Sequence, residues 1–351
     1  MIPNLALVPE LKAAGYEIYY IGSHTGIERE LVERANIPYF GISSGKMRRY
    51  MSVKNMTDLL RVCKGFVDAA RVIRKIRPDI IFSKGGFVVV PVVAAARFLR
   101  VKAVIHESDM TPGLANRLAI PFAAKVCVSF PETLKHVPEK KGVLTGSPIR
   151  SELLAGSKTR MSLGFDNRPV LLITGGSQGA AAINTCVREA LPQLLENFNV
   201  VHLCGKGNLA KIEQPGPVVR DTNRSPVQPG YVQFEYLNEE MADMLALADI
   251  VISRAGANTL FELAALRKPN LLIPLPAEVS RGDQLLNAAS FERQGFSMVL
   301  PEGDMTPRRL AADVKQLFKK REEFTRNMEA ARDVTGGTRR VMDVIAHVTQ
   351  L

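Results

Sequence analysis

The stretch Leu171-Leu-Ile-Thr-Gly-Gly-Ser-Gln-Gly-Ala180 decides the fold, because it reads as a buried strand, a glycine turn and the start of a helix. Glycines in such a turn let backbone N–H groups approach a diphosphate, and the dipole of the following helix favours negative charge. The hydroxyl group of Ser177 adds a donor. A tight turn without a ligand is the alternative. Because the stretch matches neither a P-loop nor a clean G-x-G-x-x-G pattern, it indicates phosphate binding without naming the ligand.

Short strand-like runs alternate with helix-period stretches on both sides of this turn, which is the pattern of parallel βα units. We expect strands at 17–22, 39–43, 79–83, 102–106, 125–130 and 142–145, and then at 169–174, 199–204, 231–237, 249–253, 269–274 and 296–300. Helical stretches such as 56–76 and 180–195 lie between them. The 351 residues are too many for one ordinary core. The sequence therefore predicts an α/β protein with two doubly wound domains that face each other across a cleft.

The longest apolar run, 87–96, has ten residues and ends at Arg97. A bilayer span needs about 20 apolar residues, so we expect a buried strand and turn here rather than a membrane helix. The amino-terminal stretch lacks a basic region and carries Glu10 within its apolar part, so it is not a signal peptide. Four scattered cysteines without a C-x-x-C pair indicate reduced thiols in a cytoplasmic protein.

The net charge of +11 arises entirely from the first 150 residues, which hold 23 Lys and Arg against 12 Asp and Glu, whereas the rest hold 23 of each. Ten of the basic residues lie between Gly45 and Arg77, where Asp58 and Asp68 are the only acids. Apolar residues are interleaved with them, which suits an anionic bilayer surface, where each Lys or Arg contributes about 1 kcal/mol. A solvated helix face is the next alternative. Nucleic acid comes last, because no recognition helix, zinc finger or RNA-binding signature is present.

Glycine and polar clusters also follow other predicted strands, where α/β folds bind phosphates and nucleotides. They are Ser83-Lys-Gly-Gly-Phe87, Gly205-Lys-Gly207 and Ser253-Arg-Ala-Gly-Ala-Asn-Thr259. The last leads into a helix that carries Glu262. A carboxylate there can accept both hydroxyl groups of a ribose, and a solvated helical Glu is the alternative.

Two further strand ends carry acid–base or sugar-binding groups. His106 and Glu107, followed by Ser108 and Asp109, are good acid–base candidates, although a lone His is more often structural. Asp283 and Gln284 offer a carboxylate and an amide suited to sugar hydroxyls. The sequence has no D-x-D pair and no H-E-x-x-H spacing, so we expect a site without metal or cofactor.

Together these motifs resemble the MurG glycosyltransferases, which convert lipid I to lipid II at the cytoplasmic face of the membrane. The matching segments are PNLAL (3–7), YIG with GIE (20–28), KGGFVVVP (84–91), HESDMTPGLAN (106–116), GSPIR (146–150), GGSQGA (175–180), HLCGKG (202–207), SRAGANTLFEL (253–263) and DQLLNA (283–288). The resemblance implies the glycosyltransferase-B fold. Residues 1–150 would form an acceptor and membrane-side Rossmann-like domain, residues 165–335 a domain that binds UDP-N-acetylglucosamine, and residues 336–351 a helix that packs back on the first domain.

Carried over residue by residue, the resemblance implies two binding regions and two catalytic candidates. The donor would contact Arg150, Gly175, Gly176, Ser177, Gln178, Gly179, Tyr236, Leu237, Arg254, Glu262, Asp283 and Gln284. The glycine turn and Arg150 would hold the diphosphate, Tyr236 and Leu237 the uracil, Glu262 the ribose, and Asp283 with Gln284 the sugar. The acceptor would lie near Lys84, Gly85, Gly86, Phe87, Asp109 and Asn116. His106 and Glu107 are the candidates for proton removal from the acceptor 4-hydroxyl.

The implied partners are UDP-N-acetylglucosamine, undecaprenyl-linked lipid I, an anionic membrane surface and other proteins of cell-wall synthesis, with no nucleic acid. The implied location is peripheral, on the cytoplasmic face of the cell membrane. Ser108-Asp109 replaces the usual Gln-Asn of the family, and Phe87 stands where Tyr is common. The family also opens with a strand and a Gly-Gly-Thr-x-Gly-His turn, which are missing before Pro3. The alternatives are therefore a different lipid-linked glycosyltransferase of this fold, or a catalytically impaired membrane-associated module that binds UDP-sugar.

Overall fold

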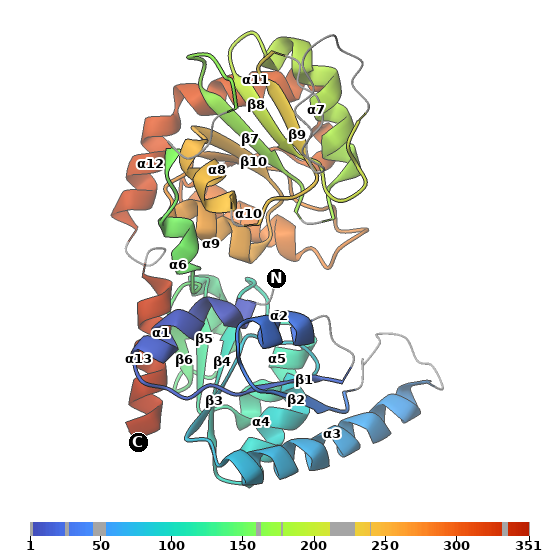
Figure 1. The fold of residues 1–351 in the computed structure, drawn as a ribbon, viewed down its shortest axis with the longest axis vertical. Helices are drawn as coiled ribbons and strands as arrows, with labels where there is room; N and C mark the ends of the chain where they lie inside the picture. Colours follow the sequence, from blue (N-terminus) through green and yellow to red (C-terminus); the bar gives the residue numbers. More distant parts are fainter. Residues whose placement is uncertain are drawn as a thin grey trace. The chain divides into compact units, whose positions relative to one another are not determined.

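The computed structural model describes residues 3–24, 28–44, 54–158, 163–176, 178–210, 229–238, 240–331 and 336–350. The chain divides into two compact units (Figure 1). Unit 1 comprises residues 1–150 together with 336–351, and unit 2 comprises residues 151–335.

Unit 2 is built around a six-stranded parallel sheet with the order β12-β11-β10-β7-β8-β9. The strands are β7 (Val170–Thr174), β8 (Asn199–Leu203), β9 (Tyr231–Phe234), β10 (Ile250–Ser253), β11 (Asn270–Leu272) and β12 (Ser297–Val299). The central strands are apolar and buried on both faces because helices cover both sides of a parallel sheet. The order is that of a doubly wound fold, in which the direction of winding reverses beside the first strand. Here the reversal lies between β7 and β10.

Helices precede and follow the strands of unit 2, and the longer ones bury one face. They are α6 (Ser151–Leu154), α7 (Ala181–Leu194), α8 (Met241–Leu247), α9 (Ala257–Ala265), α10 (Asp283–Arg293), η5 (Glu302–Asp304), α11 (Pro307–Lys319) and α12 (Arg321–Ala330). In α11 the buried residues Leu310, Val314 and Leu317 recur at helical spacing and face the core. The helix begins where Thr306 caps it by accepting the backbone N–H of Arg309 at 3.2 Å.

Unit 1 contains two parallel sheets, one of β1 and β2 and one with the order β3-β4-β5-β6. The strands are β1 (Tyr20–Ser23), β2 (Tyr39–Ile42), β3 (Ile80–Ser83), β4 (Lys102–Glu107), β5 (Lys125–Val128) and β6 (Gly142–Leu144). Every residue of β4 after Lys102 is buried. Its carboxyl end therefore carries His106 and Glu107 into the interior of the unit.

The helices of unit 1 include one from the far end of the chain. They are η1 (Pro3–Leu7), α1 (Val8–Ala13), α2 (Glu28–Arg34), α3 (Lys54–Ile76), α4 (Val89–Phe98), α5 (Leu114–Ala119), η2 (Ile120–Phe122), η3 (Pro131–His136) and α13 (Gly337–Gln350). Val341, Ile345 and Val348 of α13 form one buried cluster with Leu7 of η1 and with residues of β4 and β5. The last helix thus completes the core of the unit that contains the first residues.

The predicted strands and helices are found, with one exception. All twelve predicted strands overlap β1 to β12, and the predicted α/β class is confirmed. The strand and turn predicted for 87–96 are wrong, because Val89–Phe98 form α4. Helix α4 packs against α3 and the sheet and is buried on most sides, so its sequence has no period that distinguishes a helix from a buried strand. Pro91 is tolerated because the first N–H groups of a helix have no partner within it.

Within the described residues, none of the helices combines the length and the apolar character that a membrane crossing requires.

Candidate functional site

The reversal point of the unit 2 sheet brings two of the predicted site motifs together. Thr174 of β7 and Ser253 of β10 are register partners at the carboxyl ends of neighbouring strands. The glycine turn follows the first, and Arg254 to Gly256 follow the second. Open α/β sheets bind ligands at this place, outside the carboxyl ends of the strands where the winding reverses.

The backbone of the glycine turn requires glycine for two reasons. Gly176 and Gly179 have φ angles of 86° and 75°, in the left-handed region that other residues rarely adopt. A Cβ atom on Gly179 would also collide with the carbonyl oxygen of Cys204. Of the other predicted residues, Gly175 and Gln178 lie in the same turn, and Ser177 lies outside the described residues. The turn leads directly into α7.

A second turn, Gly205 to Gly207, is stacked on the first. A Cβ atom on Gly205 would collide with the backbone nitrogen of Gly179. Glu235 holds this turn from the end of β9, because its carbonyl accepts the Gly205 N–H at 2.9 Å and its Oε1 atom accepts the Gly207 N–H at 2.8 Å. The two glycine turns therefore form one backbone surface at the end of β7 and β8.

The side chain of Arg254, predicted at the donor, is bonded within its own unit. Its Nη1 atom donates to the carbonyls of Ile273 at 3.0 Å and Pro274 at 3.4 Å, and its Nη2 atom forms an ion pair with Glu302. The side chain is only 13% exposed. Arg254 thus ties the turn after β10 to the end of β11 and to η5. Buried Asn287 of α10 supports the same turn by donating to the Ala255 carbonyl at 3.3 Å.

The remaining predicted donor residues lie on α9, α10 and the segment after β9. Glu262 lies in the second turn of α9 and is partly exposed. Asp283 pairs with Arg281 at 3.2 Å, and Gln284 Oε1 accepts the Leu275 N–H at 3.1 Å. Tyr236 is 39% exposed, whereas Leu237 packs against the core of unit 2. Tyr236 is therefore the more accessible of the two residues predicted at the uracil. Arg150 belongs to unit 1.

In unit 1 the predicted acceptor residues gather after β3 and β4. Gly85 and Gly86, with φ angles of 104° and 91°, form the turn after β3. Lys84 donates from Nζ to the Ser147 hydroxyl at 3.3 Å. A Cβ atom on Gly85 would lie 3.5 Å from both polar atoms of the Asn116 side-chain amide. Phe87 begins the segment that leads into α4, and Asp109 follows β4.

Asn116 is 4% exposed and faces this turn. Its Nδ2 atom donates to Glu107 Oε2 at 2.8 Å and to the His106 carbonyl at 3.2 Å. Its Oδ1 atom is buried and has no hydrogen-bond partner among the described residues. Beside the Gly85 turn there is thus an acceptor atom that a bound hydroxyl or N–H group can satisfy.

His106 and Glu107, the predicted catalytic pair, are both held by their own chain. His106 is fully buried, and its Nε2 atom lies 2.9 Å from the Gly146 carbonyl. Burial and the nearby charge of Lys84 hold the pKa of His106 well below its ordinary value, so the ring is neutral. Because a carbonyl only accepts, the proton of this neutral ring is on Nε2.

Glu107 organises the loop after β4. Its carboxylate accepts the N–H groups of Asp109 and Gly113 at 3.0 Å each, besides the Asn116 amide. Burial raises the pKa of this carboxyl group, although the hydrogen bonds it accepts act in the opposite direction. Glu107 therefore closes the loop 108–113 around one buried carboxylate.

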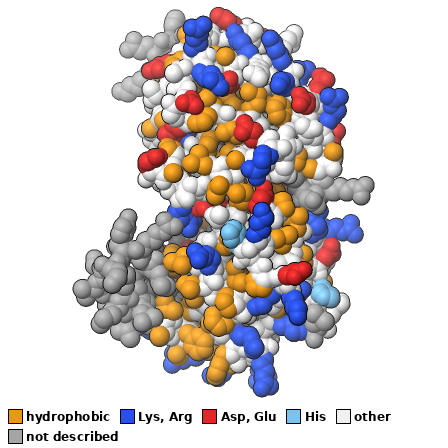
Figure 2. Space-filling model, turned by 180° about the vertical axis from the view of Figure 1, so that it is seen from behind, with side chains coloured by type: hydrophobic (Ala, Val, Ile, Leu, Met, Phe, Trp, Pro, Cys, Tyr) orange, Lys and Arg blue, Asp and Glu red, His pale blue; other side chains and the backbone are white. Residues whose placement is uncertain are grey.

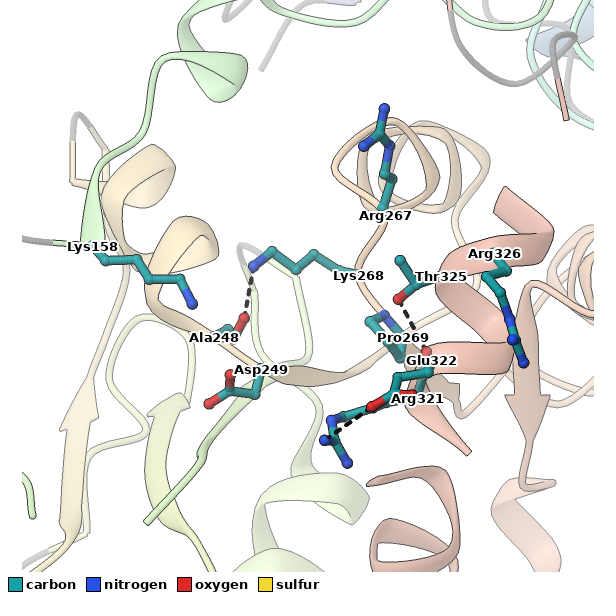
Figure 3. A pocket seen from close by; sticks show the side chains of 10 residues that line it. All are labelled: Lys158, Ala248, Asp249, Arg267, Lys268, Pro269, Arg321, Glu322, Thr325 and Arg326. Atoms are coloured by element: carbon teal, nitrogen blue, oxygen red, sulfur yellow. Dashed lines mark hydrogen bonds and ion pairs between the residues drawn. The ribbon is translucent and has the colours of Figure 1, made fainter. Parts of the chain in front are cut away.

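A cavity of about 390 Å³ lies at the opposite, amino-terminal edge of the unit 2 sheet and contains none of the predicted residues (Figure 3). Its lining is strongly basic. Lys268 donates to the carbonyls of Ala246 at 3.2 Å and Ala248 at 2.7 Å and so closes the end of α8. Arg267 pairs with Glu329 at 3.0 Å. These side chains serve the fold, so the carboxyl edge of the sheet is the stronger candidate site.

The sequence pattern assigned no role to several side chains that hold the donor region in place, although two of them lie in the matching segments 202–207 and 283–288. They are Asn184, Arg188, His202, Tyr231, Glu235 and Asn287. The one available signal was polar residues within buried stretches, such as His202 in an otherwise apolar strand. Their hydrogen-bond partners lie far away in the sequence, so the sequence pattern does not show which segments these side chains join.

Comparisons with known families cover both units. A family model described as glycosyltransferase family 28 N-terminal domain matches residues 1–128, and one described as glycosyltransferase family 28 C-terminal domain matches residues 170–345.

Similar proteins are found among sequences and among solved structures. The UDP-N-acetylglucosamine--N-acetylmuramyl-(pentapeptide) pyrophosphoryl-undecaprenol N-acetylglucosamine transferase of Lachnospira eligens is 55% identical over 93% of this chain and 90% of that protein. The protein of the same name from Clostridium perfringens strain SM101 is 52% identical over 98% of this chain and 93% of that protein. The crystal structure of MurG from Acinetobacter baumannii is similar with a TM-score of 0.73 and 25% identity, covering 99% of this chain and 95% of that one.

Proposed function

The chain belongs to glycosyltransferase family 28, among the UDP-N-acetylglucosamine--N-acetylmuramyl-(pentapeptide) pyrophosphoryl-undecaprenol N-acetylglucosamine transferases, and on this premise we propose which residues hold its substrates. It is a transferase of N-acetylglucosamine in lipid II synthesis and has the two-domain glycosyltransferase-B fold. The observation that carries the donor proposal is the glycine turn at the reversal point of the unit 2 sheet.

The donor diphosphate binds at this turn. Within the turn the Gly179 N–H donates to the Gly176 carbonyl at 2.9 Å and the Gly176 N–H to Thr174 Oγ1 at 3.3 Å. The amino terminus of α7 follows, and its first N–H groups and positive dipole favour an anionic ligand. In the transition state negative charge grows on the departing diphosphate, and fixed N–H donors stabilise it without reorganising. Ser177 and Gln178 supply further donors from the same turn. The assignment of Arg150 to the diphosphate stays a prediction.

The nucleoside and the sugar are assigned to the neighbouring strand ends. Glu262 accepts the ribose hydroxyls, and exposed Tyr236, with Leu237 behind it, covers the uracil. Asp283 and Gln284 receive the N-acetylglucosamine hydroxyls at the start of α10. Arg254 acts through the turns that it joins, because its guanidinium group is bonded to two carbonyls and Glu302.

The acceptor diphosphate is assigned to unit 1, beside Lys84, the Gly85–Gly86 turn and Phe87, with Asp109 on the loop after β4. The Oδ1 atom of Asn116 supports this, because among the described residues it has no partner and it can accept a hydrogen bond from the acceptor substrate. His106 and Glu107 shape this region by holding the Gly146 carbonyl and the loop 108–113. Their direct role as proton acceptors stays a prediction.

The reaction is a single displacement with inversion. The acceptor 4-hydroxyl oxygen forms a bond to the anomeric carbon while the bond from that carbon to the β-phosphate oxygen breaks. The electron pair of the broken bond leaves with UDP, and the hydroxyl proton passes to a base. The N–H groups of the glycine turn serve the leaving group, and the unit 1 residues orient the attacking hydroxyl.

A membrane surface is the proposed location, with unit 1 as the docking unit. Phe98 at the end of α4 is 70% exposed and Val67 on α3 is 45% exposed. Exposed Lys64, Arg71 and Arg97 belong to the same two helices. Figure 2 shows hydrophobic side chains with Lys and Arg side chains beside them at the lower end of unit 1. Residues 45–53 of the basic stretch lie outside the described residues.

A transfer assay tests the proposed substrates. UDP-N-acetylglucosamine labelled in the sugar is incubated with the full chain and purified lipid I. Label in the lipid product, at one sugar per acceptor, is the expected result. The alternatives separate in the same experiment, because a different lipid-linked acceptor in place of lipid I tests the second enzyme hypothesis. Binding of UDP without transfer to either lipid would leave only the binding module.

A further inference from the structure

A chain of buried hydrogen bonds runs across the unit 2 sheet to the end of β8. The Tyr231 hydroxyl oxygen lies 3.0 Å from His202 Nδ1, and His202 Nε2 lies 2.9 Å from Asn184 Oδ1. Asn184 Nδ2 lies 2.8 Å from the carbonyl oxygen of Cys204. Tyr231, His202 and Cys204 are fully buried, and Asn184 is 2% exposed. Three segments of the chain, β9, β8 and α7, are thus joined by a single series of polar contacts.

The chemistry of the groups fixes the direction of every bond in this series. A carbonyl oxygen only accepts, so Asn184 donates its amide to Cys204 and presents Oδ1 to His202. His202 therefore donates from Nε2 and accepts the Tyr231 hydroxyl at Nδ1. This order requires a neutral imidazole. Burial, with the charge of Arg188, lowers the pKa of His202 to about 3, so the ring is neutral throughout the physiological range.

The Cys204 carbonyl at the end of the series supports the glycine turn. A side chain on Gly179 would collide with this carbonyl, and a side chain on Gly205 would collide with the Gly179 nitrogen. The two turns therefore touch through their backbones, and any shift of the Cys204 carbonyl shifts Gly179. Asn184 is bonded to both turns. Its side chain donates to the Cys204 carbonyl, and its backbone N–H donates at 2.8 Å to the carbonyl of Ala180, the residue after Gly179.

We propose that Asn184, held in one amide orientation by His202 and Tyr231, is a positioning residue that fixes Gly179 through the Cys204 carbonyl and so sets the place of the glycine turn and of the amino terminus of α7 for the donor diphosphate. Asn184 acts on the substrate through the turn and does not touch it. The inference rests on the proposed donor site in unit 2. Asn184 would therefore affect binding of the diphosphate, whereas a residue with a purely structural role would affect only stability.

Arg188 lies next to this series of hydrogen bonds and helps to keep His202 neutral. Its Nη2 atom donates to Gln233 Oε1 at 3.1 Å and lies 3.6 Å from Cys204 Sγ. The charge of this partly buried guanidinium group disfavours a second proton on His202. A rotated Asn184 amide would place its Oδ1 atom against the Cys204 carbonyl oxygen, and two acceptors cannot bond, so one amide orientation satisfies both neighbours.

The experiment measures the affinity of UDP and of uridine calorimetrically for the full chain and for Asn184→Ala. Uridine shares the nucleoside and lacks the diphosphate, so the ratio of the two affinities isolates the turn. We expect UDP affinity to fall at least ten-fold and uridine affinity to change less than two-fold. Asn270→Ala is the matched control. Asn270 is a buried asparagine of the same unit, 1% exposed, whose amide donates to the Lys268 carbonyl at 2.9 Å at the other edge of the sheet.

Three results of these affinity measurements would overturn the proposed role of Asn184. An Asn184→Ala protein that is folded and keeps the wild-type ratio of UDP to uridine affinity overturns it. An equal change of that ratio in Asn270→Ala also overturns it, because the effect would then be one of general stability. A wild-type chain that binds UDP no tighter than uridine removes the proposed donor site itself, and the inference with it.

A milder variant covers the case in which Asn184→Ala does not fold. Tyr231→Phe removes only the hydroxyl group that fixes the His202 ring. We expect a loss of UDP affinity of two- to five-fold, again without a matching loss for uridine. In the transfer reaction the KM for UDP-N-acetylglucosamine should rise while the KM for the lipid acceptor stays within two-fold. A rise in both KM values would contradict a role confined to the donor turn.

Discussion

Thr174 and Ser253 lie directly opposite each other as the last register pair of β7 and β10. Because the strands are parallel, the chain leaves the sheet on the same edge at both residues. It then enters α7 after the first and α9 after the second. Two helix amino termini therefore open side by side at the carboxyl edge of unit 2, where their dipoles favour an anionic ligand.

Replacing Gly179 by Ala should weaken UDP binding by more than about ten-fold, equivalent to roughly 1.4 kcal/mol. The alanine suffers left-handed strain of about 1–2 kcal/mol and also collides with the Cys204 carbonyl. Gly164→Ala is the control, because Gly164 has a φ of 68° with open space around its Cβ position. Calorimetry with UDP checks both variants. Similar UDP affinities for the two would show that the contact between the turns does not matter.

Glu262→Ala should bind UDP about ten-fold or more weakly, because ribose hydroxyls left without an acceptor in a site cost roughly 1–3 kcal/mol. UDP and uridine should lose affinity equally, since both carry the ribose. Titration calorimetry gives both values, and Glu292→Ala, an exposed acid on α10, is the control. Unchanged UDP affinity in a folded Glu262→Ala protein would remove Glu262 from the site.

Glu107→Gln should impair use of the acceptor while donor binding is retained. One oxygen of the new amide replaces a carboxylate that accepts three N–H groups, so the loop 108–113 loses hydrogen bonds. We expect the KM for lipid I to rise about ten-fold, from a loss of roughly 1–3 kcal/mol in loop order. Steady-state transfer assays measure it, with Glu139→Gln, an exposed acid of unit 1, as control. An unchanged KM for lipid I would argue against this role.

Phe98→Ser should weaken binding to phosphatidylglycerol vesicles about ten-fold, because inserting a Phe side chain contributes roughly 1.5–3 kcal/mol. Binding of the wild-type chain should also fall as salt rises, since surface charges are screened within about 8 Å at physiological ionic strength. Co-sedimentation measures both. Leu154→Ser, at a residue of unit 2 that is 58% exposed, should bind like wild type. Equal binding of all three chains to neutral vesicles at every salt concentration would contradict the docking surface.

Lys268 should make the stability of unit 2 depend on pH between about 8 and 10.5. Burial, with the charge of Lys158, lowers the pKa of Lys268 to about 8. In this window the unfolded chain holds a proton that the folded chain lacks, so the free energy of unfolding rises with pH. Urea unfolding at pH 8, 9 and 10 should show a smaller rise for Lys268→Met than for the wild type. Lys319→Met, at an exposed residue of α11, should keep the wild-type rise.

The sheets were predictable because their strands carry strong local signals. Runs such as Val170–Thr174 and Ile250–Ser253 are almost wholly apolar and end in glycine or polar turns, so the sequence places both strands to within one residue. The same reasoning placed the glycine turn at a strand end. It gave the wrong structure for 87–96, because the first eight residues of α4 are all apolar and such a run in a helix has no visible period.

The supporting contacts of the site were less predictable, because they join residues far apart in the chain. The sequence placed Arg254 at a strand end but did not show that its guanidinium group is bonded to carbonyls 19 and 20 residues away. Asn184 reaches the Cys204 carbonyl 20 residues later. Neither pairing follows from spacing or propensity, since each depends on how two turns pack in space. Motif positions could be read from the sequence, whereas the side chains that hold them could not.

The place of α13 has a consequence for the order in which the protein matures. Val341, Ile345 and Val348 complete a cluster whose other members, including Leu7, Val104 and Cys127, are synthesised before unit 2. During synthesis one face of the unit 1 sheet therefore stays uncovered until residues 151–335 have been made. Unit 2 is thus an insertion within unit 1 that can fold first, although its sequence comes second. The earliest part of the chain acquires its finished core only when the last helix leaves the exit tunnel.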